Sequence, residues 1–130
     1  ASGANREHVV AITFDDGYAE CATAAAAVLE NHRVPASFYV CSGFIDSLGD
    51  LAHDRAAGML GLATMGRREL KDLVLRGFEL GSHTVTHCDF RSADPATVDR
   101  EIAESKSAIE STSGAPVRGL SVPFGSRAQW

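Results

Sequence analysis

The sequence predicts an α/β fold in which the strands are parallel and alternate with helices. Short runs of apolar and β-branched residues recur along the chain, and segments with a helical spacing of apolar residues lie between them. Strands that alternate with helices form βαβ units, which place the strands side by side in one sheet with right-handed crossovers. Three of the apolar runs end directly at residues that could carry chemistry.

The first half of the chain is expected to form two strands, one long helix and one short helix. Residues 9–14 are continuously apolar or β-branched, as in a strand that is covered on both faces. The helix over 18–32 is rich in alanine, and a proline separates it from a second strand over 36–41. Residues 42–66 are too irregular for one element and are expected to contain a short helix over 55–62. The apolar stripe of the long helix is expected to consist of Cys21, Ala25, Val28 and Leu29.

The second half of the chain is expected to form two helices and two strands. Apolar residues spaced three and four apart predict a helix over 67–76 that ends at a glycine, and residues 78–82 form the next strand. The last helix begins after the N-cap residue Asp94 and ends at Gly114. A final strand is expected over 117–122. The apolar stripe of the last helix is expected to consist of Val98, Ile102 and Ile109.

Length and composition indicate one domain over residues 1–130. The hydrophobic fraction of 45% is sufficient for a core. A formal net charge of −5 argues against a nucleic-acid partner, and no run of Lys or Arg changes that conclusion. No apolar stretch is long enough to span a bilayer, and the first residues lack the apolar region of a signal peptide. The compartment is left open, because a signal could have been removed.

The three cysteines do not indicate a disulfide framework or a thiolate zinc site. Their number is odd, and no pair has the CxxC spacing. Cys21 and Cys41 are expected to act as small buried hydrophobic residues. Cys88 adjoins a histidine, but we expect a partly buried thiol with no chemical role.

The clusters at the strand ends predict a metal site with a neighbouring base. Asp15 and Asp16 follow the first strand, and His83 and His87 follow the third. The histidines are four residues apart, which would place them on the same side of one helical turn. Two imidazoles and one carboxylate leave a fourth metal position for water, as in catalytic zinc sites. Neighbouring strand residues point in different directions, so one aspartate can bind metal while the other takes a proton.

Each cluster by itself has a simpler explanation. An isolated Asp-Asp-Gly is more often a turn, and an isolated HxxxH is more often a solvated helix face. Ligands of parallel α/β folds bind beyond the carboxyl ends of the strands, and both clusters are expected there. The loop Pro123-Phe124-Gly125 follows the last expected strand and is predicted to join them.

These motifs resemble the polysaccharide deacetylases of the NodB-homology type, carbohydrate esterase family 4. Residues 13–17, Thr-Phe-Asp-Asp-Gly, match the first motif of that family, and residues 81–87, Gly-Ser-His-Thr-Val-Thr-His, match the second. The resemblance extends over residues 9–125. It implies a distorted (β/α) barrel, of which this chain would lack the last units. An incomplete barrel exposes a strand edge, so we expect either a fragment of a longer protein or a homo-oligomer that covers the edge.

The resemblance also implies roles for individual residues. Asp15 would be the general base, and Asp16, His83 and His87 would bind a divalent metal, usually zinc, with cobalt or another metal as an alternative. The substrate would be an acetylated glycan such as chitin, peptidoglycan or an exopolysaccharide, from which N-acetyl or O-acetyl groups are hydrolysed. The loop of Pro123 and Phe124 would bind substrate, with a backbone N–H near Phe124 stabilising the oxyanion.

The sequence departs from the family pattern at two places. Ser121 stands where many members carry an arginine that orients the base, so Asp15 would be oriented by another residue such as Arg118, or by none. The histidine that acts as general acid belongs to later motifs that have no counterpart before Trp130. His53 is expected to be a solvated loop residue and is not assigned that role.

Three functional classes are therefore weighed. The first is a metal-dependent deacetylase of N-acetylated sugars, and the second is a non-catalytic relative that binds metal or glycan. The third is an amidohydrolase that acts on a small amide, because a fold does not determine the substrate.

Overall fold

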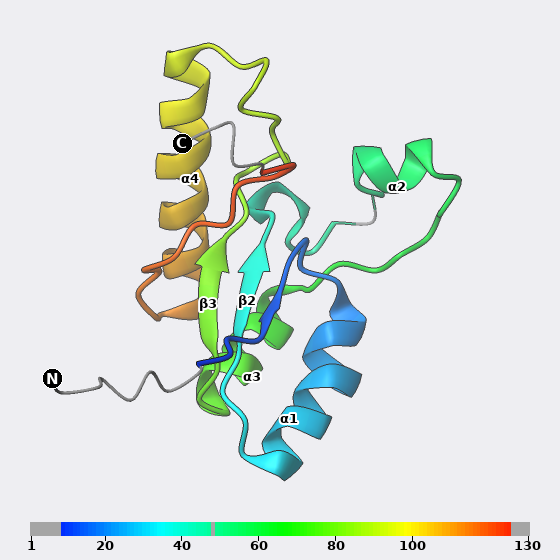
Figure 1. Ribbon diagram of the computed structural model, residues 1–130, viewed down its shortest axis with the longest axis vertical. Coiled ribbons are helices and arrows are strands. Elements are labelled where there is room, and N and C mark those ends of the chain that lie inside the picture. Colours follow the sequence, from blue (N-terminus) through cyan, green and yellow to red (C-terminus); the bar gives the residue numbers. More distant parts are fainter. Residues whose placement is uncertain (1–8, 48, 126–130) are drawn as a thin grey trace, which may run out of the picture.

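The computed structural model describes residues 9–47 and 49–125, which form a parallel three-stranded sheet with helices between the strands (Figure 1). Strand β2 lies in the centre and pairs in parallel with both neighbours. The predicted α/β fold is confirmed. The strands are β1 (Thr13–Phe14), β2 (Ser37–Val40) and β3 (Glu79–Ser82).

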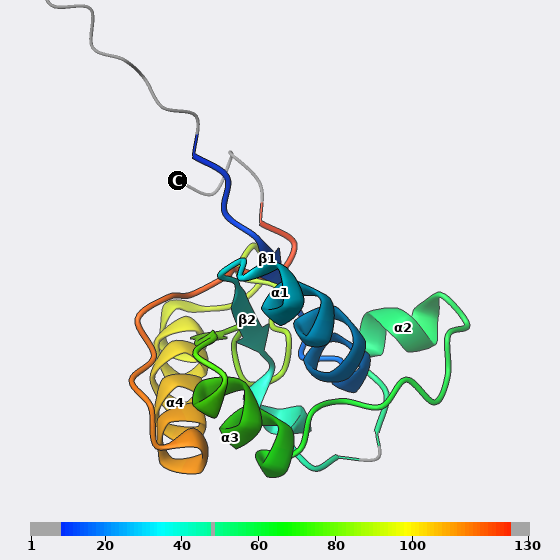
Figure 2. The same cartoon turned by 90° about the horizontal axis from the view of Figure 1, so that it is seen from below.

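The longer helices cover the sheet along one side, as the view from below shows (Figure 2). Helix α3 contacts both α4 and the π-helical segment η1 that leads into α1, so these helices form a continuous layer around the strands. No helix in the described ranges combines the length and apolar character needed to cross a membrane. The helical segments are η1 (Cys21–Ala25), α1 (Ala26–His32), η2 (Ser42–Phe44), α2 (Ala52–Ala56), α3 (Arg67–Leu75) and α4 (Pro95–Ser113).

The hydrophobic core lies between the sheet and this helical layer. Phe38 of β2 is fully buried and stacks on Phe14 with a centroid distance of 4.9 Å, while Phe78 meets it edge-on at 5.4 Å. Leu70 and Leu73 of α3 are completely buried against this aromatic cluster, as the apolar spacing of that helix predicts. The core therefore holds β2 rigidly between its neighbours, which fixes where the strand ends point.

The first predicted strand is shorter than expected. Only Thr13 and Phe14 pair with β2, while Val9 and Val10 are 89% and 84% exposed. β1 forms one edge of the described sheet, and within the described residues β2 is its one neighbouring strand. The apolar run was expected to be covered on both faces, but no layer in this part of the chain covers its first residues.

The final predicted strand, over 117–122, is reduced to a single bridge between Leu120 and Ser82 of β3. Ser82 donates to the carbonyl of Gly119 and accepts from the N–H of Ser121, both at 2.9 Å. Prolines precede and follow this segment, and proline cannot donate to a ladder. The bridge is nevertheless sufficient to bring the loop 121–125 to the end of β3.

Two helical predictions need correction. The short helix expected over 55–62 lies at Ala52–Ala56 instead, because Gly58 and Gly61 have φ values of +75° and +77° and cannot continue a helix. The stripe expected on the first helix is displaced, since Ala22, Ala26 and Leu29 are buried while Val28 is 59% exposed. The chain enters α1 through a π-helical turn, which rotates the buried face relative to a regular helix.

Helix α4 begins and ends as predicted but buries a different face. The Asp94 side chain accepts a hydrogen bond from the N–H of Thr97 at 3.0 Å, and Gly114 caps the other end with φ +77°. The fully buried side chains are Glu101, Ser105 and Ile109, whereas the predicted Val98 and Ile102 are only half-buried. A polar strip of α4 therefore faces the interior next to β3.

Candidate metal centre

The carboxyl ends of β1 and β3 bring the predicted ligands together. Asp16 Oδ1 lies 3.4 Å from His83 Nε2 and 3.2 Å from His87 Nε2. These three residues come from the two outer strands of the sheet, on either side of β2. Asp15 and the loop at Phe124 border the same open cleft, which has a volume of about 680 Å³. The structure thus assembles the residues that the strand ends predicted.

A tight turn after β1 aims the Asp16 carboxylate at the histidines. Asp16 itself has φ +69°, and Gly17 follows with φ +83° and donates to the Asp15 carbonyl at 2.8 Å. A Cβ at Gly17 would lie 3.0 Å from the Val40 side chain, so β2 leaves no room for a larger residue. Glycine is therefore required both by the backbone conformation and by the space.

His83 is held in one orientation by the loop that bridges to β3. Its Nδ1 donates to the carbonyl oxygen of Ser121 at 2.8 Å, which leaves Nε2 without its proton and available as a ligand. The side chain is almost fully buried. Burial lowers the pKa of His83, but the Asp16 carboxylate beside Nε2 and the Ser121 carbonyl at Nδ1 outweigh burial and raise it overall.

His87 reaches the site through a strained loop and not through the predicted helical turn. Thr84 and His87 have φ values of +67° and +61°, and the segment between the histidines is not helical. The expectation that HxxxH lies on one helix face is therefore wrong. Positive φ is unfavourable for non-glycine residues, and it persists only where the surroundings hold the backbone in place.

Buried Glu101 of α4 holds this loop. One carboxylate oxygen accepts from the backbone N–H of Val85 at 2.7 Å and of Thr86 at 2.9 Å, and the other accepts from the Thr86 hydroxyl at 2.9 Å. Beside it, the hydroxyls of Ser82 and Ser105 lie 2.6 Å apart. The buried polar strip of α4 thus supplies the acceptors that the histidine loop needs.

A cation fits between these ligands. Asp16 Oδ1 is buried and has no hydrogen-bond partner in the described part of the chain, although two imidazole nitrogens face it. Burial raises the pKa of Asp16, but His83 and His87 outweigh that effect, so its pKa is held far below the usual range. A carboxylate facing two imidazole nitrogens is a typical donor set for a divalent transition metal.

Asp15 is oriented by Ser121. The Ser121 hydroxyl donates to Asp15 Oδ2 at 3.1 Å, across a sequence separation of 106 residues. The sequence indicated another residue, such as Arg118, or none for this role, and the residue in the structure is Ser121 and not Arg118. Because the Leu120 bridge places residue 121 beside the end of β3, a serine is long enough to reach the aspartate.

Phe124 lines the cleft as predicted from the third cluster, whereas Pro123 is not among the lining residues in the described part of the chain. Pro123 is buried, whereas Phe124 is 47% exposed and has φ +54°. The Phe124 ring meets His87 edge-on with a centroid distance of 4.7 Å and forms one wall of the cleft. A half-exposed aromatic ring at the mouth of a cleft provides an apolar contact surface.

His53 belongs to the site, contrary to the expectation of a solvated loop residue. Its Nε2 lies 3.6 Å from Asp16 Oδ2, and its ring lies 4.4 Å from that of His87. The neighbouring Asp54 is 1% exposed and accepts a hydrogen bond from the Tyr18 hydroxyl at 2.7 Å. One signal was available in the sequence, because residue 53 lies in the connection that follows the carboxyl end of β2.

Two sets of possible ligand atoms share Asp16. Asp16, His53 and His87 form one set, and Asp16, Cys41 and His83 form the other, with all atoms of a set within 4.8 Å of one another. The Cys41 thiol donates to the His83 carbonyl at 3.2 Å, and burial raises its pKa far above the usual range. Cys41 is therefore a buried thiol, as predicted, whose hydrogen is directed at the His83 carbonyl.

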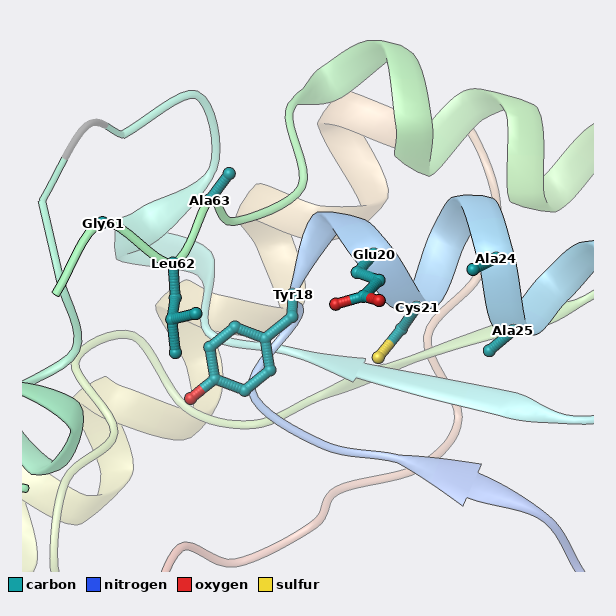
Figure 3. A pocket seen from close by; sticks show the side chains of 8 residues that line it. All are labelled: Tyr18, Glu20, Cys21, Ala24, Ala25, Gly61, Leu62 and Ala63. Carbon is teal, nitrogen blue, oxygen red and sulfur yellow. The ribbon is translucent and has the colours of Figure 1, made fainter. Parts of the chain in front are cut away.

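A second hollow lies beside η1, and Tyr18 and Leu62 form part of its wall (Figure 3). It has a volume of about 610 Å³, and its walls are mostly apolar. Glu20 and half-buried Cys21 are its only two lining side chains of ligand type. Asp15, Asp16, His83 and His87 all line the other cleft, which is therefore the candidate functional site.

Comparison with known proteins agrees with this fold. The family model described as polysaccharide deacetylase matches residues 2–129, so the chain belongs to the polysaccharide deacetylase family. A chitooligosaccharide deacetylase of Rhizobium leguminosarum bv. trifolii is 34% identical over 101 residues, which are 77% of this chain and 39% of that protein.

Solved structures show the same fold at lower identity. A Streptococcus pyogenes deacetylase in complex with acetate has a TM-score of 0.75 and 22% identity, over 95% of this chain and 50% of that one. A pseudoenzyme of carbohydrate esterase family 4 from Bacillus anthracis has a TM-score of 0.68 and 19% identity, over 93% and 37%. The chain spans half or less of the length of each of these three proteins.

Proposed function

We propose that this chain carries the metal centre and the base of a deacetylase that hydrolyses N-acetyl groups of a glycan. One observation carries the proposal. The Asp16 carboxylate faces the Nε2 atoms of His83 and His87, while Asp15 lies in the same cleft and is held by Ser121. Asp16 is thus part of the ligand set, and the adjacent Asp15 is available to take a proton.

Each residue has a distinct task in the proposed reaction. Asp16, His83 and His87 would hold a divalent ion, for which the nitrogen-rich set favours zinc or cobalt. Such an ion supplies Lewis-acid chemistry at the acetyl carbonyl and activates water. Asp15 takes the proton from the attacking water, and its hydrogen bond from Ser121 keeps Oδ2 in place. The backbone N–H of Phe124 donates to the oxyanion.

The proposed substrate is a glycan that contains N-acetylglucosamine. The Rhizobium relative is named a chitooligosaccharide deacetylase, and its similarity covers 77% of this chain. The cleft is open at the surface, and the half-exposed Phe124 ring offers a face for a sugar ring. An open cleft allows a chain of sugars to approach from the side.

The test is acetate release from N-acetylglucosamine oligomers by the zinc-loaded chain. We expect Asp15→Asn to abolish release while zinc still binds, and Asp16→Asn to abolish both. His32→Gln is the matched control, because His32 is exposed at the end of α1. Zinc binding without acetate release would contradict the proposal and indicate a non-catalytic relative. Release from small acetylated amides, but not from the oligomers, would instead indicate an amidohydrolase.

A further inference from the structure

His53 is a third imidazole at the metal centre, and the ligand set of the proposed function does not use it. It lies on α2, within the irregular connection between β2 and α3. Figure 1 shows α2 beside the end of the sheet toward which the strands point. That end carries Asp16, His83 and His87, so α2 delivers a donor from a segment that the sheet does not contain.

The Nε2 atoms of the three histidines lie at similar distances from the Asp16 carboxylate. The Nε2 atoms of His83 and His87 lie 3.4 and 3.2 Å from Oδ1, and that of His53 lies 3.6 Å from Oδ2. Two ligands bound to one tetrahedral zinc at its usual bond lengths lie about 3.3 Å apart. The ligand atoms of Asp16, His53 and His87 are also all within 4.8 Å of one another. The ligand atoms of Asp16, His53 and His87 are therefore close enough to share one ion.

A buried network holds His53 in this position. The Tyr18 hydroxyl donates to Asp54 Oδ2 at 2.7 Å and lies 3.3 Å from His53 Nε2. Tyr18 follows the Asp15-Asp16-Gly17 turn, so the network ties α2 directly to the metal centre. The His53 ring packs between this network and His87, and its side chain is 29% exposed.

The same place has an excess of unpartnered polar atoms. Asp16 Oδ1, Asp54 Oδ1 and His53 Nδ1 are all buried and lack hydrogen-bond partners among the residues described. Buried polar atoms are rarely left without partners, and a group of them indicates an ion or water that satisfies them. Partly exposed Asp16 and buried Asp54 lie 3.6 and 3.5 Å from His53 Nε2, and two carboxylates this close to one imidazole favour a cation.

We propose that His53 is a direct ligand of the metal ion, together with Asp16, His83 and His87. This inference rests on the metal centre of the proposed function and extends it. A set of three imidazoles and one carboxylate favours zinc, cobalt or nickel over magnesium and manganese, which prefer oxygen ligands. Zinc can accept a fifth ligand, so water can still bind.

The test counts imidazole ligands without measuring activity. X-ray absorption at the zinc edge is recorded on the 130-residue chain with one equivalent of zinc, and zinc affinity is measured by competition with a chelator. We expect three imidazoles in the parent chain and two in His53→Ala. The variant should bind zinc at least about tenfold more weakly, because even an outer-shell partner contributes that much. His32→Ala should match the parent in both measurements.

The outcomes separate this inference from the proposed function. Two imidazoles in the parent would overturn the inference, even if His53→Ala weakened zinc binding, because His53 would then act through Asp16. An unchanged zinc affinity in a folded His53→Ala variant, checked by circular dichroism, would also overturn it. Three imidazoles without acetate release would support the inference while the proposed function fails.

Discussion

Replacing Glu101 should damage the metal centre without touching any ligand. The carboxylate of Glu101 is buried and accepts hydrogen bonds from the N–H groups of Val85 and Thr86 and from the Thr86 hydroxyl. These donors belong to the loop that joins His83 to His87. That loop contains residues with positive φ, so it has little tendency to keep its shape unaided.

The size of the effect follows from the three hydrogen bonds. In Glu101→Ala the two backbone N–H groups lose their acceptor, which costs about 1–3 kcal/mol for each partly buried group. The Thr86 hydroxyl can turn to water because Thr86 is exposed, so it adds little. We expect the free energy of unfolding of Glu101→Ala to fall by about 3 kcal/mol. This is a large part of the roughly 5–15 kcal/mol that stabilises a typical domain. Glu101→Gln keeps one oxygen as an acceptor, so its free energy of unfolding should fall by about half as much.

The assay is urea unfolding of the metal-free chain, followed by circular dichroism, together with a zinc titration. Both histidines lie at the ends of the loop, so we expect zinc affinity to fall by about 10–100-fold in Glu101→Gln. Glu104→Gln is the matched control, since Glu104 is exposed on the same helix. If both variants kept the unfolding free energy and zinc affinity of the parent, α4 would not position the histidines.

Three further predictions concern other residues of the site. Ser121→Ala removes the donor to Asp15 and should lower kcat for acetate release about tenfold with little change in KM, the loss of one charge-assisted hydrogen bond, while Ser121→Thr restores it. Gly17→Ala should destabilise the chain by more than the roughly 1–2 kcal/mol expected for Gly58→Ala, since both have positive φ but only Gly17 meets Val40. The raised pKa of His83 means that its contribution to the stability of the metal-free chain is complete below about pH 6.5 and is lost as pH rises through the folded-state value. In thermal melts the difference between the parent and His83→Gln should therefore shrink from pH 6 to pH 9, and a difference that grew would refute the assignment.

Local patterns in the sequence were sufficient for the fold class and the ends of the long helices. Asp94 and Gly114 act through neighbouring backbone groups, so their capping roles could be predicted without tertiary information. The ligands Asp16, His83 and His87 could also be predicted, because parallel strands end at one edge of a sheet. Both predictions depend on short stretches of chain and on the direction of the strands.

His53 and Glu101 could not be assigned in the same way. His53 lies in a connection without periodic spacing, where the sequence does not indicate which side chains turn inward. Glu101 shares its helix with half-buried apolar residues, so periodicity pointed to Val98 and Ile102 as the buried face. The backbone N–H groups that need a buried acceptor belong to the loop between His83 and His87. The sequence pattern does not indicate that this loop packs against α4.

The sequence by itself determined the alternation of strands and helices, the two aspartates after β1 and the histidine pair after β3. Only the tertiary structure decided how the pair converges, which residue holds Asp15, and that a third histidine joins the site. The physical reason is the separation along the chain of the residues that interact. Strand formation and capping depend on neighbours along the chain, whereas the contacts of Ser121, Glu101 and His53 arise only when segments distant in sequence pack together.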